Sequence, residues 1–119
     1  MKTVVNIAVL LCLLTTCGAG TEVIQYAKTR NVRTLSGSAT DTTGAAIPDV
    51  QVCTMSHRWK VQLQCTTTDS QGRWSLPPLP NANTYELRFV KDGFDQVWIR
   101  VRVTQRKAAP FMVELPVAT

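Results

Sequence analysis

The chain has 119 residues and a net charge of +5, with 45% hydrophobic and 18% charged residues. This composition excludes a globally disordered chain, and about 100 residues remain after an apolar N-terminal segment, enough for one domain with one modest core. The basic excess is mild and not concentrated, so nucleic acid is not expected as a partner. Because Val, Thr and aromatic residues occur in short blocks, we expect this domain to consist of strands.

The N-terminus predicts export. Lys2 precedes an apolar stretch, residues 4–14, and then small residues, which is the pattern of an export signal. The stretch is shorter than the roughly 20 apolar residues that span a bilayer. Two processing routes are open. Ordinary cleavage removes residues 1–19 and leaves a soluble product that begins near Gly20.

The second route depends on a sequence similar to a bacterial lipobox. Residues 14–17 read Leu-Thr-Thr-Cys, although Thr16 departs from the small residue usual at that position. In this case a lipoprotein signal of residues 1–16 is removed and Cys17 is lipidated. A membrane is then expected as a partner only through this lipid anchor.

Two of the four cysteines remain after either route. Cys12 lies in the leader and Cys17 is removed or lipidated, which leaves Cys53 and Cys65. In an exported protein such a pair predicts a disulfide. A hairpin centred near Trp59 makes the two cysteines direct neighbours, whereas a one-residue shift forbids the bond. The alternative is two independent small apolar residues.

The mature chain divides into a tether and a domain. Residues 20–31 are polar without a clear period, so we expect a tether with room for a short helix, followed by the domain, residues 32–119. Turn-forming Gly, Pro, Asp and Asn separate seven extended segments in this domain. These are residues 33–41, 50–56, 61–69, 73–77, 84–90, 96–104 and 110–117.

Alternation within these segments predicts which side chains face a core. In the second segment Val50, Val52 and Thr54 face inward, and later segments repeat this period of two. Short strands at regular spacing without a helical period predict an all-β, seven-stranded antiparallel sandwich of two sheets. The other inward residues are expected to be Trp74, Leu76, Tyr85, Leu87, Phe89, Val97, Ile99, Val101 and Val103.

The stretch "TTTDSQGRWSLPPLP", residues 66–80, carries the strongest motif. Together with "SGSATDTTGAAIPDVQV", "YELRFVKDGF" and "VELPV", it resembles the carboxypeptidase regulatory-like domain family over residues 32–117. The matching positions are Thr68, Asp69, Gly72, Leu79, Pro80, Tyr85, Gly93 and Phe94. Trp74 stands where Tyr is usual, and Asp49 replaces a common Gly after Ile47 and Pro48.

The resemblance implies a prealbumin-like (transthyretin-like) Greek-key sandwich. It does not imply an activity, because such domains occur as accessory modules in many exported proteins. Asp69 and Gly72 are expected to form a turn rather than a site, since Asp accepts backbone hydrogen bonds and Gly permits the reversal.

Catalysis and metal binding are not expected. A serine hydrolase needs a base beside a nucleophile, but His57, the single histidine in the sequence, lies at the predicted hairpin tip next to Arg58 and Trp59, where we expect solvent exposure rather than the buried pairing that a base requires. One histidine and two distant cysteines do not make a zinc site. The aspartates in connections are not spaced as a calcium loop. We therefore predict neither enzyme activity nor a cofactor; the aspartates concerned are Asp41, Asp49, Asp92 and Asp95.

The remaining candidate is a surface. Trp98, Arg100 and Arg102 point outward, with Arg88 on the neighbouring strand, a group suited to stacking on sugars or holding anionic groups. The alternative is a solvated face on which long Arg stems cover apolar area. Two functions follow: an exported, non-catalytic accessory or binding module of the bacterial periplasm or cell envelope, whose partner is a protein or glycan, or a membrane-tethered spacer without a specific ligand.

Overall fold

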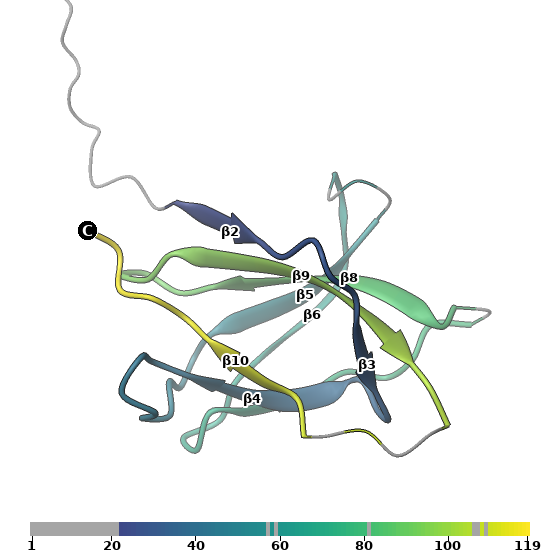
Figure 1. Ribbon diagram of the computed structural model, residues 1–119, viewed down its shortest axis with the longest axis horizontal. Coiled ribbons are helices and arrows are strands. Elements are labelled where there is room, and N and C mark those ends of the chain that lie inside the picture. Colours follow the sequence, from purple (N-terminus) through teal and green to yellow (C-terminus); the bar gives the residue numbers. More distant parts are fainter. Residues whose placement is uncertain (1–21, 57, 59, 81, 106–107, 109) are drawn as a thin grey trace, which may run out of the picture.

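The computed structural model describes residues 22–56, 58, 60–80, 82–105, 108 and 110–119, which form nine strands in two sheets (Figure 1). The smaller sheet has the order β10 (Met112–Glu114), β4 (Ser36–Thr40) and β7 (Arg73–Ser75). The larger sheet has the order β2 (Val23–Gln25), β9 (Gln96–Val103), β8 (Thr84–Val90), β5 (Gln51–Met55) and β6 (Gln62–Thr67), and β3 (Arg30–Val32) also pairs with β9.

The all-β sandwich predicted from the sequence is confirmed. Each of the seven expected segments contains one strand, β4 to β10 in chain order. The hairpin strands β8 and β9 lie closest to their expected bounds, because uninterrupted alternation marks both along their whole length.

Two features of the predicted architecture are corrected. The expected tether, residues 20–31, contributes β2 and the first two residues of β3 within its described part, and both strands run parallel to β9. β10 also runs parallel to β4, so the sandwich is not wholly antiparallel. Hairpin connections impose antiparallel pairing, but these partners are distant in the chain and no short turn joins them.

The core lies between the two sheets and follows the predicted alternation. Trp74 of β7 packs edge-on against Phe89 of β8 and Phe111, with ring centroids 5.6 and 6.0 Å apart. Such T-shaped contacts are favourable because the positive edge of one ring meets the negative face of another. The aromatic cluster therefore lies between the two sheets and contacts both. Other fully buried side chains are Val50, Val52, Leu87, Val97, Val101 and Leu115.

A buried threonine fixes the connection that leads into β5. The Thr68 hydroxyl donates to the Ile47 carbonyl at 2.7 Å and accepts from the Val50 N–H at 2.9 Å. Between them, Asp49 has a φ of 61°. This left-handed conformation explains why the resembling family commonly has Gly there, and Asp is among the residues that tolerate it.

Candidate functional site

The four residues suggested by the sequence as a binding face lie together on the outer side of the larger sheet. Trp98, Arg100 and Arg102 alternate along β9 with the buried residues between them. Arg88 of β8 lies directly opposite Trp98. The two strands thus present one outer face with these four side chains, and its binding role stays a prediction.

Glu86 lies in the middle of this face. It lies opposite Arg100, and its Oε2 accepts a hydrogen bond from Arg100 Nη2 at 2.7 Å. The Glu86 side chain is 13% exposed and that of Arg100 is 43% exposed. A charge-assisted bond to a shielded carboxylate fixes the guanidinium in one orientation and offsets part of the cost of burying Glu86.

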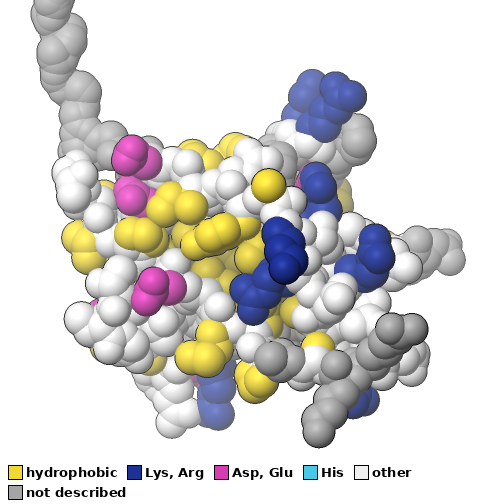
Figure 2. All heavy atoms as spheres, viewed as in Figure 1, with side chains coloured by type: hydrophobic (Ala, Val, Ile, Leu, Met, Phe, Trp, Pro, Cys, Tyr) yellow, Lys and Arg dark blue, Asp and Glu magenta, His cyan; other side chains and the backbone are white. Residues whose placement is uncertain are grey.

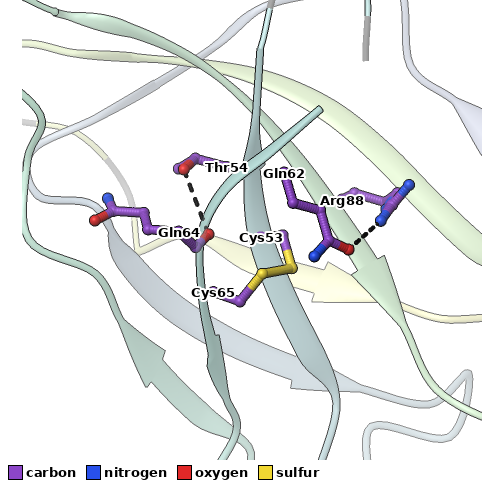
Figure 3. The surroundings of a disulfide bond; sticks show 6 residues. All are labelled: Cys53, Thr54, Gln62, Gln64, Cys65 and Arg88. Carbon is purple, nitrogen blue, oxygen red and sulfur yellow. Dashed lines mark hydrogen bonds between the residues drawn. A yellow bond between two sulfur atoms is a disulfide. The ribbon is translucent and has the colours of Figure 1, made fainter. Parts of the chain in front are cut away.

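Hydrogen bonds also hold the other two half-buried side chains. Arg88 Nη2 donates to Gln62 Oε1, reaching across β5 (Figure 3). Trp98 Nε1 donates to Gln96 Oε1 at 3.1 Å. These side chains are therefore ordered before any partner arrives, which lowers the entropy lost on binding.

Arg102 differs from the other two arginines. It is exposed, lies opposite the exposed Thr84, and forms no ion pair with the residues that the structure describes. Its guanidinium is therefore the basic group of this face that is open to an external anion.

Sequence reasoning missed Glu86 and Gln62. The alternation in residues 84–90 places Glu86 on the same face as Arg88, and a hairpin register would have paired it with Arg100. The sequence pattern does not reveal the position of Gln62, because a register irregularity between Thr54 and Met55 places Gln62 opposite Met55.

The predicted Cys53–Cys65 disulfide is confirmed. The two residues are direct cross-strand partners, with Cα atoms 4.0 Å apart (Figure 3). Both belong to the outer face, as expected, but Cys53 is only 1% exposed while Cys65 is exposed. Cys53 lies in β5, which is flanked by strands on both sides, between Cys65 of β6 and Arg88 of β8. The disulfide therefore fastens the edge strand β6 beside the candidate face.

The stretch around Asp69 forms a turn, as the sequence predicted. Asp69 Oδ1 accepts from the N–H groups of Gln71 and Arg73 at 2.8 and 3.0 Å, and Gly72 has a φ of 76°. Three residues after Asp41, Gly44 also has a positive φ, and Asp41 Oδ1 accepts bonds from its own turn. These two aspartates are thus committed to backbone geometry.

Because of these two turn aspartates, we expect the free energy of unfolding to fall at acidic pH. Hydrogen bonds lower the pKa of Asp41, chiefly from the Thr43 side chain, and that of Asp69, chiefly from the Arg73 N–H. The pKa of each carboxyl is lower in the folded protein than in the unfolded chain. The stabilisation that the ionised carboxylates give is therefore complete above about pH 4, and it is lost as the pH falls through their lowered pKa values in the folded protein.

We expect the urea midpoint of an Asp41→Asn/Asp69→Asn variant to fall less steeply with acidification than that of the natural protein. Asn keeps an acceptor oxygen but does not titrate in this range. Urea titrations at a series of acidic pH values measure the difference, and parallel midpoint curves for the two proteins would contradict it.

The described residues contain no group of three or more His, Cys, Asp or Glu side chains placed to hold a metal ion. Asp95, one of the aspartates in the connections between strands, is 9% exposed, and its Oδ1 accepts a hydrogen bond from the Glu22 N–H at 3.2 Å. His57 and Cys17 lie outside the described residues. Within the same described part, no helix is long and apolar enough to cross a membrane.

Comparison with protein families identifies the family of this chain. No curated protein sequence matches the chain. The family model described as carboxypeptidase regulatory-like domain matches residues 34–116, which include β4 to β10. This family is a non-catalytic, regulatory-like β-sandwich. The chain belongs to the carboxypeptidase regulatory-like domain family.

Proposed function

We propose that this protein is an exported, non-catalytic binding module of the bacterial cell envelope that docks on a partner protein through the outer face of β8 and β9. The observation that carries the proposal is the row in which Trp98 lies opposite Arg88 and beside Arg100, with each side chain held by a neighbour. Trp and Arg that are ordered in advance are typical of the residues that dominate binding energy at protein interfaces.

A protein fits this face better than a glycan. Trp98 is half-buried, and its Nε1 is already bonded to Gln96. A sugar-stacking site needs a broadly open ring face, whereas a protein partner gains from the flanking guanidinium groups as well. Arg102 then offers its charge at the rim, where it steers association more than it adds affinity.

Export is supported by the disulfide and by the N-terminal sequence. Disulfides persist in oxidising compartments such as the periplasm and are rare in the cytosol. Lipidation of Cys17 would leave only residues 18–22 between the anchor and β2, a reach of about 20 Å at full extension. The domain would then lie close to the bilayer, which suits a partner in the same membrane.

The test is binding of the purified domain to an envelope fraction. We expect Trp98→Ala and Arg102→Glu each to lower the bound fraction severalfold, while Arg33→Glu, the same charge change at another exposed position, leaves it unchanged. Protease treatment of the fraction should abolish binding and glycosidase treatment should not. Melting temperatures of all variants control for unfolding.

Two results would contradict this proposal. Loss of binding after glycosidase treatment alone would identify a glycan as the partner. Binding that none of the substitutions changes, or no binding at all, would favour the tethered spacer, in which the paired arginines only solvate the sheet.

A further inference from the structure

A second surface, separate from the outer face, lies between the edges of the two sheets. β10 is an edge strand of the smaller sheet, and the segment from β2 to β3 runs along β9 in the larger sheet. Between them is a groove of about 410 Å³. Figure 2 shows a band of hydrophobic side chains on this side of the molecule, with Lys and Arg side chains beside it.

The groove has an apolar floor and an apolar rim. Ile99 and Val113 line it and are each only 3% exposed, so they form its floor. Tyr26 and Met112 also line it but are 46% and 58% exposed. Burying exposed apolar surface lowers the free energy. Large apolar side chains that stay open to water beside a groove therefore indicate a surface on which a partner binds.

The backbone of β10 is open along this groove. The Phe111 carbonyl accepts from the Ser38 N–H, and the Leu115 N–H donates to Thr40. Alternate residues of a strand bond to opposite sides, so residues 111, 113 and 115 face β4. The N–H and C=O groups of Met112 and Glu114 therefore point away from β4, where the described residues supply no further strand.

Charge is distributed unevenly around the groove. Lys28 and Arg30 line it from the β2–β3 side and are exposed, and the Arg30 guanidinium lies 5.3 Å from the centre of the Phe111 ring. Glu114 lines the β10 side. A ligand with a negative group near Lys28 and Arg30, and none near Glu114, would complement this distribution.

We propose that this groove binds an extended acidic-apolar peptide segment of another protein by strand addition to β10. The peptide backbone pairs with Met112 and Glu114, an apolar side chain enters above Ile99 and Val113, and an Asp or Glu side chain meets Lys28 and Arg30. The open N–H and C=O groups of β10 repeat every second residue, as do the groups of an extended peptide that would pair with them. An amphiphilic small molecule has no such repeating donors and acceptors.

A randomised octapeptide display library is the probe. Selection on the full domain should enrich peptides with apolar residues at alternate positions and an Asp or Glu. The strongest of these is then synthesised in two forms, unmodified and N-methylated at alternate residues. N-methylation retains the side chains but removes the backbone donors, so it should weaken binding more than about tenfold.

Substitutions on β10 test the same contact from the side of the protein. Met112→Pro removes an N–H that does not bond to β4, and edge strands tolerate Pro. It should reduce peptide affinity more than about tenfold, while Met112→Ala, which keeps the N–H, should reduce it less. Lys28→Glu should weaken binding severalfold, and Lys60→Glu, at another exposed lysine, should not.

Several outcomes would overturn the proposal. These are no enrichment, enriched peptides without alternation, or equal binding of the N-methylated peptide. Binding of laurate that Met112→Pro leaves intact would assign the groove to an amphiphile. A dimer in sedimentation that Met112→Pro dissociates would assign it to a second copy of this chain. If Met112→Pro does not fold, the N-methylated peptide still decides.

Discussion

Replacing Trp74 by alanine is expected to lower the free energy of unfolding by about 3 to 5 kcal/mol, the usual range for removing a buried large aromatic side chain. Trp74 is 5% exposed and contacts the rings of both Phe89 and Phe111. Its removal leaves a cavity where the two sheets meet. Because small domains are stable by only about 5 to 15 kcal/mol, this is a large part of the total.

Two matched variants make the measurement specific. Trp98→Ala removes the same side chain from the half-buried outer face and should cost less. Trp74→Phe keeps an aromatic ring and removes the buried Nε1, for which the described residues offer no hydrogen-bond partner, so it should also cost less than Trp74→Ala. Denaturant titration gives all three values. A Trp74→Ala midpoint equal to that of the natural protein would contradict the central place of Trp74 in the core.

Loss of the Cys53–Cys65 disulfide is expected to cost about 3 kcal/mol, since the bond closes a short loop and restricts the unfolded chain. The cysteines are 12 positions apart and join the edge strand β6 to β5. Reduction of the natural protein and the Cys53→Ala/Cys65→Ala substitution should lower the urea midpoint to a similar extent. Adding a reductant to the double variant should change nothing.

Thiol labelling of the unreduced, denatured mature protein tests the bond itself. Cys53 and Cys65 should not react until a reductant is added. If both cysteines of the purified protein label without reduction, the pairing and the stability expected from it are wrong.

The sequence was most informative where one face of a strand is buried. Alternation placed Leu87 and Phe89 toward the core and Arg88 outward, and the same hairpin logic placed Cys53 opposite Cys65. These features depend on neighbours within a strand or across one turn, which a single sequence displays directly.

The features that the sequence did not predict depend on distant partners. β2 and β3 are three residues each, largely exposed, and become strands because the edge of β9 offers hydrogen-bonding groups, as in the Tyr26 N–H bond to the Trp98 carbonyl. The hydrogen bond between Arg88 and Gln62 reaches across β5, and the groove beside β10 needed the arrangement of both sheets. Tertiary context therefore decided these elements.

One measurement tests the exported, disulfide-bonded binding module most directly: the intact mass of the protein isolated from its native host without reduction. The proposal predicts a chain that begins at lipidated Cys17 or near Gly20, and that lacks the two hydrogen atoms lost when Cys53 and Cys65 are oxidised. A chain that retains residues 1–16 and carries both thiols reduced would contradict export, and with it the proposed function in the cell envelope.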